Sequence, residues 1–235
     1  MEGRATGFEK RGEAGSGLHA RLARLFGWFD ERLDLRLPIH GMLTHPVPAH
    51  VRWYHCFGGI TLLLFGIQVV TGILLSFYYK PVPDQAYESL QQLVYNLPFG
   101  WVRSIHRWAA NGMILMVGLH MVRVFATGSY KPPREFNWVV GVLLLSITLA
   151  FAVTGFLLPW TQRAYWATME TLGVVESLPV IGPAVAGALR GGAEVGAPTL
   201  ARFYSLHILV LPIVSGFLLA LHFAMVRRQG ISGPM

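Results

Sequence analysis

The chain has little charge and a single cysteine. Only 13% of its 235 residues are charged, whereas a soluble domain usually carries about 25%. One cysteine excludes an intrachain disulfide framework and any CxxC or CxxCH site. The first 50 residues contain no apolar run long enough for a secretory signal, so we expect no cleaved signal. Because 53% of the residues are hydrophobic, the composition points to a membrane protein.

The basic residues are distributed as topology signals. The net charge is +7, but Lys and Arg lie at the ends of apolar segments and form no basic stripe, so we expect no nucleic-acid partner. Thirteen of them fall on the side of the two termini, and six fall on the opposite side. Because basic residues stay inside, the N- and C-termini are expected to face the cytoplasm.

Four apolar segments are long enough to cross a hydrocarbon core, which takes about 20 residues. The fold class is therefore predicted to be an all-α membrane protein, a four-transmembrane-helix bundle with an N-terminal amphipathic surface helix. The forty-residue connection at 161–201 is expected to carry short helices on the outer face. The predicted transmembrane helices are 55–78, 103–126, 136–160 and 202–227.

The N-terminal region divides into two parts. Residues 1–20 are rich in Gly and charge and are predicted to be a disordered tail. Residues 21–54 form an arm whose first part alternates apolar and charged residues at helical spacing. This pattern is typical of a helix lying on the membrane surface, although an ordinary solvated helix has it too. Residues 55–235 are left as one membrane domain.

Two predicted helices each carry two histidines. His106 and His120 are 14 residues apart, and His207 and His222 are 15 apart. These spacings return to nearly one helix face, with the two rings separated by roughly 21–23 Å along the axis. The two helices run parallel, so His106 matches His207 in depth and His120 matches His222. Ionisable residues inside a membrane are costly and usually functional.

Two histidine pairs at two depths favour two haems over zinc. Zinc needs four ligands close together, and these pairs are too far apart to combine. One imidazole from each of two helices supplies both axial ligands of a haem iron. With no open iron position, we expect electron transfer rather than oxygen chemistry.

Glycines and arginines accompany the histidines. Two glycine pairs on the other two helices, Gly58 with Gly72 and Gly141 with Gly155, share the 14-residue period. They would let a flat macrocycle approach the backbone, although small residues also serve helix packing. Basic residues near the histidines could bind anionic propionates or act as interfacial anchors: Arg103, Arg107, Arg123 and Arg227.

From Trp28 to Met235 the chain resembles cytochrome b of quinol–cytochrome c oxidoreductases, and in particular the short, split b6 form of the b6f and menaquinol–cytochrome c reductase complexes. The 15-residue spacing on the last helix is of the b6 kind. The segments that carry the resemblance are WFDERLDL, CFGGITLLLFGIQVVTG, RSIHRWAANGMILMVGLHMVRV, KPPREFNWVVG, VTGFLLPW, RFYSLHILVLP and HFAMVRRQGISGP.

The resemblance implies the function of an oxidoreductase subunit that is not active alone. His106 and His207 would bind a haem b on the positive side, and His120 and His222 one on the negative side. Cys56 would hold a third, c-type haem through a single thioether, unless it is a buried free thiol. Electrons would pass from quinol through both b haems to a quinone, coupled to proton translocation.

The resemblance also implies partners. The expected partners are a second cytochrome b fragment like subunit IV with its PEWY loop, a Rieske iron–sulfur protein and a c-type cytochrome, in a dimeric complex. The basic N-terminal extension and the alanine- and glycine-rich composition favour a multi-pass position in a bacterial cell membrane over a thylakoid membrane. One departure concerns proton supply on the negative side, because Gly41 stands where some members carry an acidic residue; His40 is a substitute.

Two other functions stay open on the residues alone. The membrane anchor of a hydrogenase or formate dehydrogenase is also a di-haem four-helix protein, but it lacks the paired glycine period and the RFYSLH segment. A transporter or helical scaffold with histidines at its interfaces would be colourless.

Overall fold

The computed structural model describes residue 17, residues 19–25 and residues 49–231, and the chain divides into two units, 1–49 and 50–235. In the first unit, residues 19–25 are helical. Most of the predicted tail, residues 26–37 of the predicted surface helix, and both His40 and Gly41 lie outside the described residues. The description below concerns the second unit.

The described part of the second unit, residues 50–231, contains helices and no strand. One turn is a 3-10 helix (η2) and one is a π-helix (η3). In chain order the elements are η2 (Trp53–Cys56), α3 (Phe57–Ser76), α4 (Pro83–Asn96), α5 (Trp101–Ala126), α6 (Glu135–Leu157), α7 (Gln162–Glu176), α8 (Gly182–Arg190), α9 (Ala197–Ser205), η3 (Leu206–Val210) and α10 (Leu211–Gln229).

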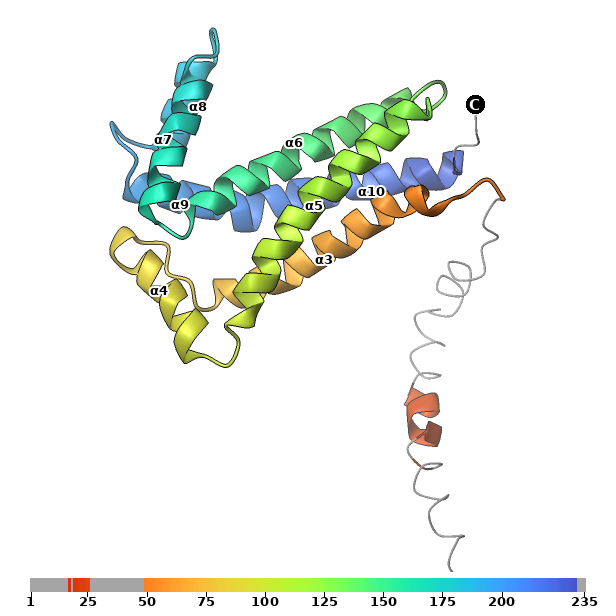
Figure 1. The fold of residues 1–235 in the computed structure, drawn as a ribbon, viewed down its shortest axis with the longest axis horizontal. Helices are drawn as coiled ribbons and strands as arrows, with labels where there is room; N and C mark the ends of the chain where they lie inside the picture. Colours follow the sequence, from red (N-terminus) through yellow and green to blue (C-terminus); the bar gives the residue numbers. More distant parts are fainter. Residues whose placement is uncertain (1–16, 18, 26–48, 232–235) are drawn as a thin grey trace, which may run out of the picture. The chain divides into compact units, whose positions relative to one another are not determined.

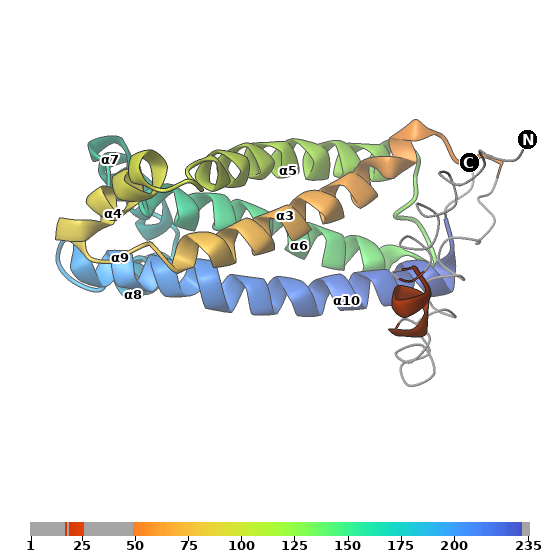
Figure 2. The same ribbon diagram turned by 90° about the horizontal axis from the view of Figure 1, so that it is seen from below.

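Four helical stretches of the described chain are long and apolar enough to cross a membrane, which confirms the predicted fold class. Figures 1 and 2 show α3, α5, α6 and α10 side by side. The helices α4, α7 and α8 lie at one end of this bundle, called here the loop-helix end; the other is called the η2 end. The four stretches are Trp53–Ser76, Trp101–Ala126, Glu135–Leu157 and Ala197–Gln229.

The bundle is built from two closely packed helix pairs. α3 packs mainly against α5, and α10 packs mainly against α6. Each pair joins one helix that carries glycines with one helix that carries histidines, because Gly58 and Gly72 lie on α3 whereas Gly141 and Gly155 lie on α6. This pairing positions the candidate site.

The amphipathic helix α4 was not predicted. Its buried residues Ala86, Leu90 and Leu93 are spaced four and three residues apart and so share one helix face. Pro83 begins the helix, where its missing N–H costs no hydrogen bond. The apolar face is too short for a membrane span, so a search for long apolar runs passes over it.

The largest buried core lies at the loop-helix end. There α4, α6, α7 and α9 pack together, and Phe203 of α9 is only 2% exposed. This cluster holds the connecting helices onto the bundle. Its buried members are Tyr79, Ala86, Leu90, Leu157, Leu172, Val195, Leu200 and Phe203.

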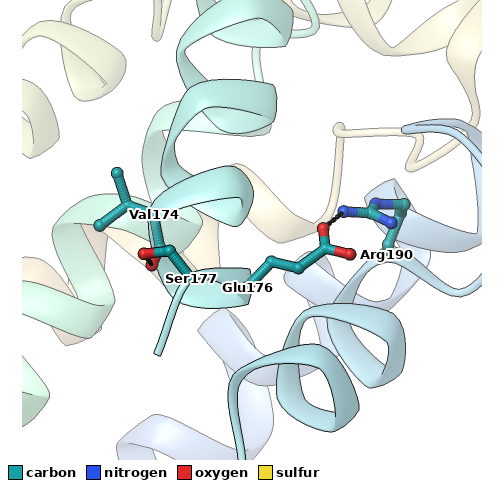
Figure 3. Close-up of polar contacts among 4 residues, drawn as sticks. All are labelled: Val174, Glu176, Ser177 and Arg190. Atoms are coloured by element: carbon teal, nitrogen blue, oxygen red, sulfur yellow. Dashed lines mark hydrogen bonds and ion pairs between the residues drawn. The ribbon is translucent and has the colours of Figure 1, made fainter. Parts of the chain in front are cut away.

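The connection between α6 and α9 is a helical hairpin fixed by polar contacts. Arg190 of α8 forms an ion pair with Glu176 at the end of α7 (Figure 3). The Ser177 hydroxyl donates to the Val174 carbonyl at 2.7 Å, which closes the last turn of α7. Arg202 of α9 donates to the Ala188 carbonyl of α8. The hairpin is therefore tied to the start of the fourth spanning stretch.

Removing the Tyr79 hydroxyl should destabilise this end. Its O–H donates to the Leu158 carbonyl at 2.6 Å, and Tyr79→Phe leaves that acceptor without the bond. We expect the free energy of unfolding to fall by about 1–3 kcal/mol, measured by denaturant titration in detergent micelles. Tyr95→Phe is the control, because Tyr95 is 78% exposed. An equal loss in both variants would contradict the assignment.

Burial raises the pKa of Tyr79, and the neighbouring Tyr204 adds to the rise. The raised pKa means that folding favours the protonated phenol. This contribution to stability is present below the ordinary tyrosine pKa of about 10 and is lost as the pH rises above it.

Candidate functional site

His106 and His207 face each other near the loop-helix end of the bundle. His106 lies on α5 and His207 in the π turn η3. Their ring centres are 6.4 Å apart, and the ring planes are inclined by 66°. Two imidazoles on opposite sides of one metal ion, with metal–nitrogen bonds of about 2 Å, have ring centres roughly 6 Å apart. The separation therefore fits bis-imidazole coordination.

Threonine hydroxyls fix the tautomer of both rings. Nδ1 of His106 lies 2.8 Å from the hydroxyl of Thr71, which donates its proton to the Ile67 carbonyl. A hydroxyl that already donates can only accept here, so Nδ1 carries the ring proton and Nε2 keeps a free lone pair. A metal-ligating histidine usually has its second nitrogen held in this way.

Thr154 of α6 does the same for His207. Its hydroxyl lies 3.0 Å from Nδ1 of His207 and donates to the Ala150 carbonyl at 2.8 Å. The two histidines therefore receive the same support from the two glycine-bearing helices.

Each of the four glycines lies against one of the four histidine rings. A Cβ at Gly155 would stand 2.7 Å from Cε1 of His207, and a Cβ at Gly72 would stand 3.4 Å from Cε1 of His106. At the η2 end, a Cβ at Gly58 would be 3.1 Å from Cε1 of His120. The shared 14-residue period thus has a direct cause: each glycine makes room for an imidazole.

The π turn absorbs the extra residue between His207 and His222. At about 100° per residue, fifteen α-helical residues would place His222 about 60° off the His207 stripe. A π turn holds roughly one residue more than an α turn, so the stretch behaves as if fourteen residues separated the rings. Pro212 explains the turn, because it lacks an N–H and its ring would crowd the preceding turn.

His120 and His222 line a cavity of about 300 Å³ at the η2 end. Its wall also contains Asn137 of α6 and Gln229 of α10. Oδ1 of Asn137 and Oε1 of Gln229 are buried without a hydrogen-bond partner. Buried polar atoms are normally paired, so these two acceptors indicate that a bound molecule completes the polar contacts of this cavity.

Two reciprocal hydrogen bonds on the cavity wall join the connection before α6 to the end of α10. Arg134 donates to the Gln229 carbonyl at 2.9 Å, and the Gln229 amide donates to the Pro133 carbonyl at 2.9 Å. These bonds hold the start of α6 to the end of α10.

The four predicted arginines are placed differently. Arg123 is partly buried and lines the cavity. Arg103 is partly buried near the opposite pair, whereas Arg107 and Arg227 are exposed. The structure also places Arg134 on the cavity wall, which the sequence analysis did not predict.

Cys56 ends the short helix η2 as an exposed free thiol. The residue before it, His55, lines the cavity of His120 and His222. The sequence analysis assigned no role to His55.

Sequence reasoning also missed the two threonines, although a signal for them exists. The tripeptide Val-Thr-Gly occurs at 70–72 and at 153–155, once on each glycine-bearing helix. The repeat places a hydroxyl beside each glycine of the loop-helix end. No repeated motif marks Asn137, because its place on the cavity wall depends on where α6 begins.

Comparison with known proteins agrees with this geometry. The family model described as Cytochrome b/b6/petB matches residues 42–230. The chain is 47% identical to Cytochrome b6 of Acaryochloris marina over 215 residues, which cover 91% of this chain and 100% of that protein. The chain belongs to the cytochrome b/b6 family. Cytochrome b6 of Synechococcus elongatus is 48% identical over the same shares of the two chains.

A solved structure titled "Hyperthermophilic respiratory Complex III" contains a similar chain. The TM-score is 0.79 at 32% sequence identity, over 88% of this chain. This chain spans only 56% of the length of that one.

Family membership confirms the general function. The chain is a multi-pass membrane protein that binds b haems and transfers electrons as a subunit of a multi-subunit quinol oxidoreductase. The hydrogenase or formate dehydrogenase anchor is not favoured.

A methyl group at Gly155 should displace His207. In Gly155→Ala the new Cβ would lie 2.7 Å from Cε1 of that ring, closer than real contacts allow. We expect loss of one of two b-haem signals in a reduced-minus-oxidised absorption spectrum. Gly66→Ala is the control, because a Cβ there meets nothing within 4 Å. A normal spectrum for Gly155→Ala would contradict the role of Gly155 in making room for the His207 ring.

Proposed function

We propose that this chain carries electrons across the membrane between two b haems, one held by His106 and His207 and the other by His120 and His222. The paired histidines at two depths carry this proposal. It is supported by the 6.4 Å ring separation at the loop-helix end and by the cavity at the η2 end. When bound, a b haem supplies a one-electron carrier at each depth.

The chain's own residues arrange the two carriers. Fourteen α-helical residues on α5 separate the two histidine levels by about 21 Å. Thr71 and Thr154 hold the rings of the loop-helix pair in the coordinating tautomer. The apolar surface of the four spans keeps water and lipid headgroups away from the route between the two levels.

The orientation in the membrane follows from the charge distribution, and the direction of electron transfer follows from the resemblance to cytochrome b. The loop-helix end is the outer, positive side, and the two termini lie on the cytoplasmic side. Quinol is oxidised at the loop-helix end and quinone is reduced at the η2 end, with protons released outside and taken up inside. Arg103 and Arg107 bind anionic groups at the outer level, and Arg123 and Arg227 do so at the inner level.

The chain works within a larger assembly in a bacterial cell membrane. The partners are a second cytochrome b fragment that completes the outer quinol pocket, a Rieske iron–sulfur protein and a c-type cytochrome, in a dimeric complex. The similarity to a chain of a respiratory Complex III supports this larger assembly.

Cys56 holds a third haem through a thioether to the macrocycle rather than a bond to iron. The thiol is exposed and lies in the turn next to the inner cavity. An exposed thiol at this position is free to form the bond.

Replacing His207 with Leu should remove one axial ligand and one b haem. We expect the dithionite-reduced spectrum of the complex to lose about half of its b-haem signal. His50→Leu serves as the control, because His50 does not belong to either pair. Retention of both b-haem signals in His207→Leu would contradict the assignment of His207 as an iron ligand.

Covalent attachment at Cys56 is tested by haem staining of the denatured chain on a gel. We expect a stained band for the unmodified chain and none for Cys56→Ser, with the two b-haem signals still present in the native variant. An unstained unmodified chain would eliminate the third haem.

A further inference from the structure

The inner cavity offers one side chain that can change its charge near neutral pH without being a proposed iron ligand. Among the described residues that line it there is no Asp or Glu. Arginine stays protonated and tyrosine stays neutral near neutral pH. His120 and His222 are assigned to iron. The remaining titratable side chain on the wall is His55.

The position of His55 connects the cavity to the outside of the bundle. It lies in η2, which packs against α3 and α5. Its ring stacks on Tyr54 with centres 4.7 Å apart. The side chain is half-buried, so it lines the cavity while part of it stays accessible.

The backbone of Arg52 can satisfy His55 in either protonation state. The Arg52 N–H donates to Nδ1 of His55 at 3.0 Å, and the Arg52 carbonyl lies 3.1 Å from the same nitrogen. An unprotonated Nδ1 accepts from the N–H, and a protonated Nδ1 donates to the carbonyl. Protonation of Nδ1 therefore replaces the bond from the Arg52 N–H with a bond to the Arg52 carbonyl.

The charged groups around His55 make its protonation depend on the charge of the molecule that occupies the cavity. Arg123 of α5 acts on His55 electrostatically, and Arg134 lies near Arg123. Arg52 belongs to the same turn, His50 is 6.2 Å away between ring centres, and α3 carries no charged residue. Negative charge that enters the cavity offsets this cationic surrounding, so an added electron favours the imidazolium form of His55.

We propose that His55 is a redox-linked proton acceptor, which takes a proton from the inner aqueous side when an electron reaches the inner haem. For each electron that a haem bound there would accept, the neutral imidazole of His55 would bind one proton, and it would release that proton when the electron leaves. The inference rests on the proposed function, because it requires a haem between His120 and His222.

The test is a redox titration of the intact complex between about pH 5 and pH 8, the range in which histidine titrates. The absorbance of each b haem gives its midpoint potential at each pH. In the unmodified complex the inner potential should fall as the pH rises, by at most about 59 mV per tenfold change in proton concentration.

Two variants separate the charge of His55 from its shape. In His55→Gln the slope of the inner potential should flatten at a low potential, because the side chain is always neutral. In His55→Lys it should flatten at a high potential, because the side chain keeps its charge. His50→Gln is the matched control and should keep the slope, since His50 does not line the cavity. The slope of the outer haem should be the same in all four proteins.

The outcomes distinguish the inference from the proposed function. An unchanged slope in the two His55 variants would overturn the role of His55, as would a slope lost in His50→Gln and kept in His55→Gln. Absence of a second b haem from the unmodified complex would instead contradict the proposed function itself.

Discussion

The close approach of a glycine on one helix to an imidazole on its neighbour is the contact on which the rest of the bundle depends. It is tightest at Gly58 and Gly155, where an added Cβ would crowd the facing imidazole, and looser at Gly72 and Gly141. Because each pair is fixed at two points, the helices cannot slide or rotate without losing both contacts. The register of the bundle and the depth of the histidines therefore have one common cause.

The π turn shows how this constraint is kept when the sequence changes length. The fourth spanning stretch has one residue more between its histidines than α5 has, yet both of its rings face glycines of α6. The extra residue is taken up next to Pro212, where a regular α-helical hydrogen bond is already missing. Irregular backbone thus lies beside the functional side chain, as is common for π turns.

The four spanning helices were predictable because hydropathy sums the transfer free energy over a long window. The histidine stripes followed from helical periodicity. The amphipathic helix α4 was missed because its apolar face is short and its composition is mixed. The threonine hydrogen bonds to His106 and His207 were missed because they depend on the rotation of neighbouring helices, which periodicity along one helix does not give. The orphaned oxygen of Asn137 likewise appears only when α6 and α10 are placed together.

The uneven distribution of buried side chains has a consequence for how the two ends of the bundle are held. The main core lies at the loop-helix end, whereas the opposite end is joined by the short-range contact between Arg134 and Gln229. The two bonds there run from one side chain to the backbone of the other connection, so losing either side chain removes a direct tie between the start of α6 and the end of α10. The buried core at the loop-helix end contains neither residue, so the two ends of the bundle are held by separate sets of contacts.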